Sequence, residues 1–230
     1  MIAARGRRPV YIELCGLAGV GKTTLSRRIR RALPQRHFFA RDKRRESLLQ
    51  LLAGDREHAK AAVRLLRYTS IERGAILTRA IAQTRFILGT AKRTDYRKHP
   101  RGALLLDEGP VTHLVALGGY GPRWDDFVPL LVPDRSAADP VYIFLAAEGA
   151  DIEARLRARA RPAKFRVGRT GKEGTDVAGR AIGQRYWFER LTRAGVRCLW
   201  VDTSGKPAET VEAEVLPFLS GALGLTRGPS

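Results

Sequence analysis

The fold of this chain is decided by one stretch, Gly16-Leu17-Ala18-Gly19-Val20-Gly21-Lys22-Thr23-Thr24. It fits the pattern G-x-x-x-x-G-K-[ST], which forms a phosphate-binding loop when it lies between a strand and a helix. Residues 10–15 are mostly apolar and favour a strand, and residues 24–33 favour a helix. The glycines let backbone amides approach phosphate oxygens closely, and the helix N-terminus attracts anions. The stretch therefore predicts a nucleotide-binding site.

Most residues of the loop have an expected role in that site. Lys22 is expected to reach the β- and γ-phosphates, and the hydroxyl of Thr23 is expected to bind Mg²⁺. The residues expected to hold the nucleotide are Gly16, Ala18, Gly19, Val20, Gly21, Lys22, Thr23 and Thr24. The motif predicts a bound nucleotide but does not predict the reaction.

The composition is that of a globular α/β protein. The chain has 230 residues, of which 44% are hydrophobic, and this is enough for one sizeable core. No apolar run approaches the ~18 residues of a membrane span. Residues 1–9 are basic but lack the apolar core of a secretion signal. Cys15 and Cys198 lie in expected strands far apart in the sequence, which favours reduced thiols and a cytoplasmic location.

The net charge of +19 raises the question of nucleic-acid binding. The basic residues are mostly arginines, as a GC-rich coding sequence would give, and they are spread along the chain instead of forming one tail. A cleft that binds polyphosphates also needs positive charge. We therefore consider nucleic acid the less favoured partner, and we expect no membrane partner. The sequence is compatible with a homodimer.

Strand-like and helix-like segments alternate along the chain. Strands are expected at residues 10–15, 37–40, 103–107, 141–145 and 196–201, and helices at 24–33, 110–117, 151–160, 179–194 and 208–220. This alternation predicts a mostly parallel sheet covered on both faces. Ligands in such sheets bind beyond the carboxyl ends of the strands. The loops after residues 15, 41, 107, 146 and 202 are therefore expected to surround the site.

In these features the chain resembles P-loop kinases of the nucleoside and nucleotide kinase group, in particular the thymidylate-kinase-like branch. The resemblance rests on the loop at 16–24, the strand that ends in Asp107, the arginine-rich stretch 155–161 and the ending Val201-Asp202-Thr203-Ser204. It implies a P-loop NTPase three-layer sandwich of the α/β class, with a five-stranded parallel sheet in the order 2-3-1-4-5. It also implies a single domain at 1–225 with a lid at about 155–178. Residues 226–230 are expected to form a disordered tail.

The resemblance also implies roles for residues outside the loop. Asp107 would hold Mg²⁺ through water or accept a proton from the acceptor hydroxyl, and Arg155 and Arg159 would close over the transferring group. Asp42 is the alternative to Asp107 as the base. The remaining candidates for the acceptor site are Arg41, Arg44, Arg73 and Glu108. Glu108 stands where these kinases usually carry an arginine, so the substrate branch stays open.

These features favour an ATP-dependent phosphotransferase that acts on a nucleotide, a nucleoside or another small hydroxyl compound. A regulatory GTPase is less favoured because Pro110 stands where a switch glycine would follow Asp107, and the segment 90–95 has the wrong spacing for a guanine reader. The main alternative is a P-loop ATPase that acts on nucleic acid or protein. The acidic pair Asp107-Glu108 suits that class as well.

Overall fold

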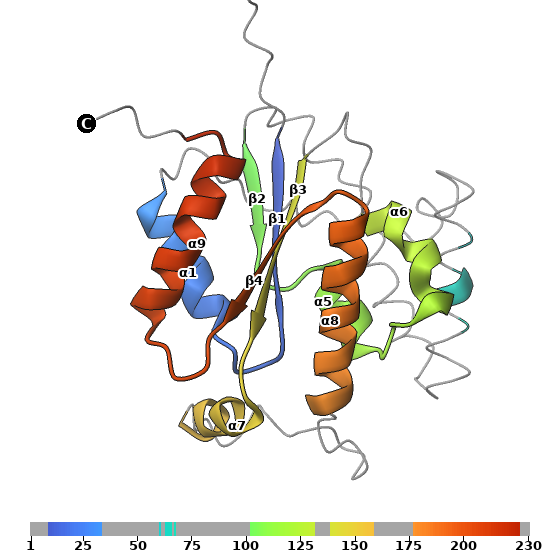
Figure 1. Cartoon of the computed structure of the whole chain (residues 1–230), viewed down its shortest axis with the longest axis horizontal. Helices are drawn as coiled ribbons and strands as arrows, with labels where there is room; N and C mark the ends of the chain where they lie inside the picture. Colours follow the sequence, from blue (N-terminus) through green and yellow to red (C-terminus); the bar gives the residue numbers. More distant parts are fainter. Residues whose placement is uncertain are drawn as a thin grey trace, which may run out of the picture.

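The computed structural model of the chain describes residues 9–33, 60, 63–65, 67, 102–131, 139–158 and 177–225. Strands and helices alternate along this part of the chain (Figure 1). The strands are β1 (Val10–Gly16), β2 (Ala103–Leu106), β3 (Asp139–Ala146) and β4 (Arg197–Asp202). The helices are α1 (Lys22–Ala32), α5 (Pro110–Ala116), the 3-10 helix η4 (Pro122–Phe127), α6 (Val128–Leu131), α7 (Gly149–Ala158), α8 (Val177–Arg193) and α9 (Ala208–Ala222).

The sheet is parallel and has the order β2-β1-β3-β4. The central strand β1 pairs on both sides, so that Val10 lies opposite Ala103 of β2 and Asp139 of β3. The sequence predicts five strands, whereas the sheet has four within the described residues. The four strands keep the relative order expected for them. The segment 37–40, which is expected to form the other strand, lies outside the described residues.

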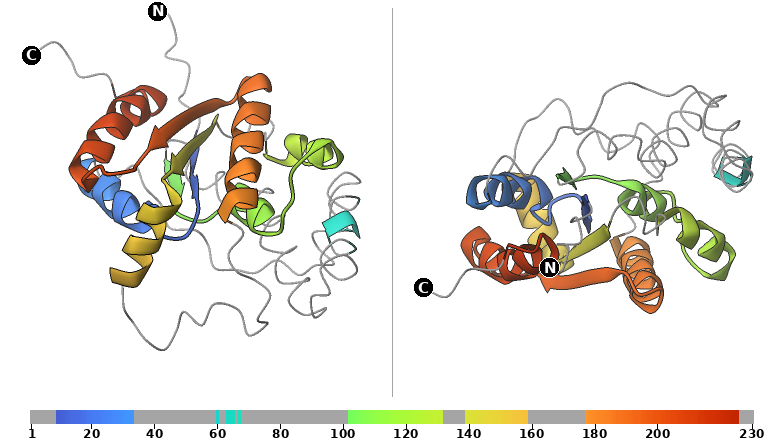
Figure 2. Two further views of the ribbon diagram at one scale, coloured as in Figure 1. Left: turned by 60° about the horizontal axis from the view of Figure 1, so that its bottom comes forward. Right: turned by 90° about the horizontal axis from the view of Figure 1, so that it is seen from above.

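The two faces of β1 form two separate cores. Tyr11 and Cys15 point to one face and pack with residues of α5 and α8, whereas Ile12 and Leu14 point to the other and pack with α1 and α9. All four side chains are buried, as expected for a parallel strand with helices on both sides. Figure 2 shows α1 and α9 on one side of the sheet and α5 and α8 on the other. The three-layer arrangement predicted from the sequence is confirmed.

The helices predicted from apolar spacing are present, with ends that differ from the expected ones by a few residues. The carboxyl ends of all strands lie at one edge of the sheet, where β1 leads into α1 and β3 into α7 (Figure 1). This edge is where the phosphate-binding motif falls. Among the described helices, none is both long enough and apolar enough to cross a membrane.

Candidate nucleotide-binding site

The phosphate-binding motif adopts the strand–loop–helix context that it requires. Strand β1 ends at Gly16, and α1 begins at Lys22. Gly21 precedes the helix with φ of 101° and Gly19 has φ of 95°, conformations that side chains rarely adopt. No side chain caps α1, and no acidic residue lies in its first turn. The first amides of α1 are therefore directed at the loop without a competing carboxylate, which suits a phosphate.

Close packing explains the other loop glycine. A Cβ atom at Gly16 would lie 2.7 Å from the carbonyl oxygen of Leu145 in β3. The backbone of the loop can therefore run directly against the neighbouring strand only if residue 16 has no side chain.

Lys22 spans the loop from inside. Its Nζ donates hydrogen bonds to the carbonyl oxygens of Gly16 at 2.7 Å and Leu17 at 3.0 Å. The side chain is only 8% exposed, so the ammonium group is held within the loop rather than in bulk water. A cation held in this position can neutralise phosphate oxygens that bind to the loop amides.

Thr23 and Asp107 come together although 84 positions separate them in the sequence. The Oγ1 of Thr23, in the first turn of α1, donates a hydrogen bond of 3.2 Å to Oδ2 of Asp107, which follows β2. A hydroxyl and a carboxylate at the edge of a phosphate site fit Mg²⁺, which prefers oxygen ligands and keeps several waters. The described residues contain no cluster of three or more His, Cys, Asp or Glu side chains that could hold a metal ion instead.

A cavity of about 310 Å³ lies on the α9 side of the loop. We call it the α9-side cavity; its lining residues are Gly19, Val20, Gly21, Thr24, Leu25, Leu145, Arg155, Ala158, Thr203, Lys206, Ala208 and Val211. Arg155 forms one wall, because its guanidinium donates to Oγ1 of Thr203 at 3.1 Å and to the Thr203 carbonyl oxygen at 2.5 Å. The hydroxyl of Thr203 in turn donates to the carbonyl oxygen of Ala146 at 2.9 Å. Thr203 thus holds Arg155 in the lining of this cavity, to which the loop residues Gly19, Val20 and Gly21 also contribute.

A second cavity of about 160 Å³ lies on the opposite side of the loop. We call it the α5-side cavity; its lining residues are Cys15, Gly16, Leu17, Ala18, Lys22, Glu108, Val111, Thr112, His113, Val115, Ala116, Arg180 and Gln184. Arg180 and Gln184 are four residues apart on α8, so they share one face of that helix. Gln184 is 3% exposed, and its Nε2 donates to the carbonyl oxygen of Leu145 at 2.8 Å.

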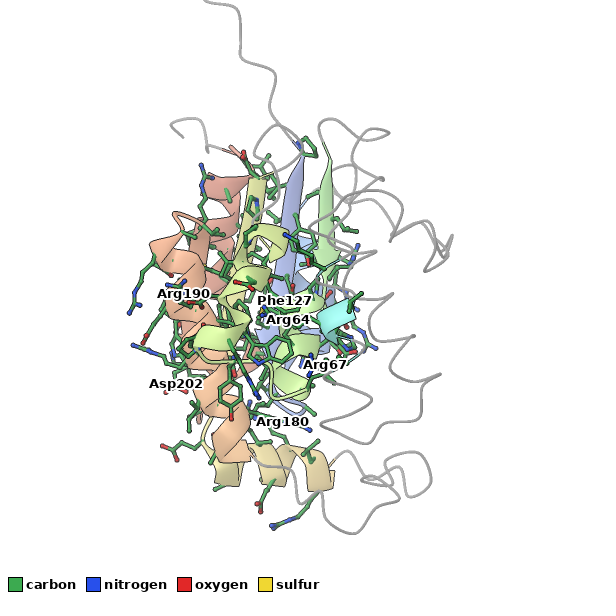
Figure 3. The ribbon with its side chains drawn as sticks, turned by 90° about the vertical axis from the view of Figure 1, so that its right-hand side faces the viewer. Arg64, Arg67, Phe127, Arg180, Arg190 and Asp202 are labelled. Carbon is green, nitrogen blue, oxygen red and sulfur yellow. The ribbon has the colours of Figure 1, made fainter. Side chains whose placement is uncertain are left out.

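The sequence analysis missed Arg180 and Gln184. Figure 3 shows Arg180 toward the end of the sheet where α7 lies, which is the end that carries the phosphate loop. The spacing of the two residues was the available signal, but an arginine and a glutamine one turn apart also occur on solvent-exposed helix faces. Only the packing of α8 against α5 shows that they face a cavity.

The structure assembles part of the predicted site. It brings Lys22, Thr23 and Asp107 together, and it places Glu108 in the lining of the α5-side cavity. The predicted residues Arg41, Asp42, Arg44, Arg73 and Arg159 lie outside the described residues. Their roles remain predictions from the sequence.

The described elements and the phosphate-binding motif together define a P-loop fold of the α/β class. No family model matches the sequence, and no curated protein matches it. Among solved structures, thymidylate kinase from Candida albicans matches at 14% identity with a TM-score of 0.51, over 97% of this chain and 96% of that chain. Deoxyadenosine kinase from M. mycoides with bound dATP also matches at 14% identity with a TM-score of 0.50, over 92% of this chain and 100% of that chain. The chain therefore has the fold of P-loop nucleoside and nucleotide kinases.

Proposed function

We propose that this protein is an ATP-dependent kinase that transfers the γ-phosphoryl group to a nucleotide, a nucleoside or another small hydroxyl compound. One observation carries the proposal: Lys22 lines the α5-side cavity, and the loop that it spans continues into the α9-side cavity. A kinase needs a donor pocket and an acceptor pocket that meet at the transferring phosphate. The α9-side cavity suits the base and ribose of ATP, and the α5-side cavity suits the acceptor.

Each residue of the site has a defined part in this mechanism. The loop amides and Lys22 would bind the β- and γ-phosphates, and the Thr23 hydroxyl and, through water, Asp107 would hold Mg²⁺. Bound Mg²⁺ supplies additional neutralisation of the charge on the phosphate oxygens. Arg180 lines the α5-side cavity together with Lys22, where a guanidinium can stabilise charge on the transferring group. Asp107 or Asp42 accepts the proton of the acceptor hydroxyl.

The finer features of the kinase group belong to the same proposal. We infer one domain over residues 1–225, a further strand at 37–40 that completes the order 2-3-1-4-5, and a lid at about 155–178. The proposed lid begins within α7 and ends within α8, the helix that carries Arg180. Arg159 would act from this lid, and Arg41, Arg44 and Arg73 would bind the acceptor. A cytoplasmic location follows from the reduced cysteines and from the proposed use of ATP.

The proposal is tested by an acceptor screen with ATP and Mg²⁺, in which ADP release is measured with nucleoside monophosphates, nucleosides, sugars and aminoglycoside-type alcohols. We expect ADP release that depends on one acceptor class and a phosphorylated product detectable by mass spectrometry. ADP release that is independent of every acceptor would instead support the ATPase that works on nucleic acid or protein.

Lys22→Ala provides the matching test of the site. We expect transfer to fall by at least about 10³-fold, because charge stabilisation by a preorganised cation is lost at the transition state. The circular dichroism spectrum should be unchanged. Arg31→Ala removes an exposed cation from the same helix and should retain activity within about twofold. Full activity of Lys22→Ala would exclude the proposed mechanism.

A further inference from the structure

Glu13 is a charged residue in the middle of the central strand, where every neighbour is buried. Its side chain is 0% exposed, and it lies on the face of β1 that carries Tyr11 and Cys15. Burial raises the pKa of the Glu13 carboxyl, and hydrogen bonds from Thr112, Tyr11 and Val111 lower it in part. A buried carboxyl group is costly unless its hydrogen bonds are satisfied. The hydrogen bonds of the Glu13 carboxyl group therefore indicate its structural role.

The carboxyl group of Glu13 caps helix α5 from another element. Its Oε1 accepts a hydrogen bond of 3.0 Å from the backbone N–H of Thr112, and its Oε2 accepts one of 3.5 Å from that of Val111. Tyr11 donates its hydroxyl to Oε2 at 2.9 Å. The first amides of a helix have no partner within the helix. Pro110 has no N–H, and Gly109 offers no side-chain cap, so Glu13 binds the first two N–H groups of α5.

Gly109 shows how closely the two segments are fitted. A Cβ atom at position 109 would lie 2.4 Å from Cδ and from Oε2 of Glu13. Such a distance is shorter than any tolerable contact, so the backbone can pass over the carboxyl group in its observed position only as glycine. Gly109 is buried, and its backbone is extended rather than left-handed, so space and not conformation requires the glycine.

Both halves of the proposed site are attached to Glu13. Along the chain, Glu13 lies three residues before Gly16, where the phosphate loop begins. Its backbone pairs with Leu106, the residue before Asp107, while its side chain holds residues 109–112. Asp107 and Glu108 lie between these two attachments. Val111 and Thr112 line the α5-side cavity, so this cavity wall is also held by Glu13.

We propose that Glu13 is a positioning residue for phosphoryl transfer, which fixes Asp107 and the α5 wall of the α5-side cavity relative to the phosphate loop. The inference rests on the proposed kinase function. Glu13 contacts neither of the two cavities directly, so it acts through Asp107 and α5. A cap from residue 109 itself would satisfy α5 equally well, but it would remove the hydrogen bonds that join the N-terminus of α5 to β1. The carboxyl group on β1 thus joins the donor half to the acceptor half.

Glu13→Gln tests the inference by changing one acceptor oxygen to an amide donor at nearly constant volume. The amide must face a backbone N–H or the Tyr11 hydroxyl, so at least one hydrogen bond to α5 or Tyr11 is disturbed. We expect the Mg²⁺ concentration for half-maximal nucleotide binding to rise by about 10- to 100-fold, as for other residues that orient metal ligands. The kcat for transfer should fall by a similar factor. The affinity for a fluorescent ATP analogue without Mg²⁺ should stay within about twofold, because none of the residues held by Glu13 lines the α9-side cavity.

Tyr142→Phe is the matched control, since it also removes a buried hydrogen bond from a strand of the same core. The Tyr142 ring stays in place beside Tyr11, while its hydroxyl donates at 2.6 Å to the carbonyl oxygen of Leu131, a residue that lines neither cavity. This variant should unfold at a slightly lower temperature and keep the wild-type Mg²⁺ dependence within about twofold. An equal Mg²⁺ dependence in Glu13→Gln and wild type would overturn the inference.

Gly109→Ala provides an independent arm. As a single substitution, Gly109→Ala should raise the Mg²⁺ concentration for half-maximal nucleotide binding as Glu13→Gln does, because the added methyl group displaces the Glu13 carboxyl group. In a Glu13→Ala background the same methyl group has room, so adding Gly109→Ala should change the Mg²⁺ dependence by less than about twofold. Fully additive effects would contradict a shared cause.

Two further outcomes remain decisive. If Glu13→Gln does not fold, Tyr11→Phe takes its place, because this variant removes only the hydroxyl donor to Oε2 of Glu13. Tyr11→Phe should raise the Mg²⁺ concentration for half-maximal nucleotide binding by about two- to fivefold. An unchanged Mg²⁺ concentration would overturn the inference. If wild-type protein binds the ATP analogue with no enhancement by Mg²⁺, the proposed function fails instead.

Discussion

Each of the two cavities is lined by a different arginine. Arg155 is held by two hydrogen bonds to Thr203 at the α9-side cavity, whereas Arg180 lines the α5-side cavity with Lys22. Arg155 is one of the residues that the sequence predicts over the transferring group. It lies beside Thr203 in the lining of the α9-side cavity, and we propose that its guanidinium plane packs against the base of a bound nucleotide. Arg180, which the sequence analysis missed, lines the cavity that the proposed function assigns to the acceptor.

The two arginines should therefore give different kinetic defects. Arg155→Ala should raise the KM for ATP about 10-fold with kcat nearly unchanged, because contacts to the base are equal in the ground state and the transition state. Arg180→Ala should lower kcat about 10²-fold with little change in the KM for ATP. Steady-state kinetics at saturating acceptor would check both. Arg193→Ala, at the exposed end of α8, is the control. Identical defects in the two variants would contradict the separate roles.

At the scale of elements, α1 and α9 cover one face of the sheet as a pair. Arg28 of α1 forms ion pairs with Glu212 at 2.5 Å and Glu209 at 2.8 Å, both on α9. Val211, Val215 and Leu219 of α9 are buried against the same core as α1. Pro217 interrupts this helix at an exposed position. Because proline has no N–H, the carbonyl oxygen of Ala213 lacks its helical partner.

Replacing this proline should stabilise the protein. Pro217→Ala restores the N–H and removes a ring that clashes with the preceding turn, so we expect the free energy of unfolding to rise by about 1–3 kcal/mol. For a chain of this size the midpoint of thermal unfolding should rise by about 2–8 °C, measurable by calorimetry. Thr210→Ser, at another exposed position of α9, should change stability by no more than about 0.5 kcal/mol. A lower stability of Pro217→Ala would mean that a bend in α9 is needed for its packing.

At the scale of the whole molecule, positive charge is in large excess. Lys and Arg number 42 against 23 Asp and Glu, which gives the net charge of +19. The ion pairs among the described residues, such as Arg157 with Glu153 and Arg185 with Glu189, are mostly exposed and contribute little stability. The remaining charges repel one another in the folded state. A polyanionic ligand such as ATP would relieve this repulsion at the phosphate loop.

Salt should consequently stabilise the protein. Raising NaCl from about 20 mM to about 300 mM shortens the screening length from roughly 20 Å to roughly 6 Å, so that repulsion between distant charges is largely removed. We expect the midpoint of thermal unfolding to rise by a few degrees. The Lys22→Ala variant should show nearly the same rise, which separates general screening from anion binding at the loop. A midpoint that is independent of NaCl would show that the excess charge does not destabilise the fold.

The amino-acid sequence by itself determined the parts of this protein that depend on consecutive residues. The spacing of glycines, Lys22 and Thr23 specifies the phosphate loop, because the motif and its flanking strand and helix lie within one continuous segment. Apolar runs ending in polar residues likewise located the described strands, and with them Asp107 at a strand end. The rule that ligands bind beyond the carboxyl ends of parallel strands placed Asp107 near the loop, and the resemblance to P-loop kinases implied that it shares Mg²⁺ with Thr23.

Only the tertiary structure decided which side chains face the cavities and which residues connect them. Arg180 and Gln184 face the phosphate loop because α8 packs beside α5, a contact between segments far apart in the sequence. Arg155 lies beside Thr203 for the same kind of reason. The sequence does not identify the partners of Glu13, because Val111 and Thr112 follow it by 98 and 99 positions. Local periodicity predicts which face of a helix or strand is buried, but it does not predict which distant backbone group that face contacts.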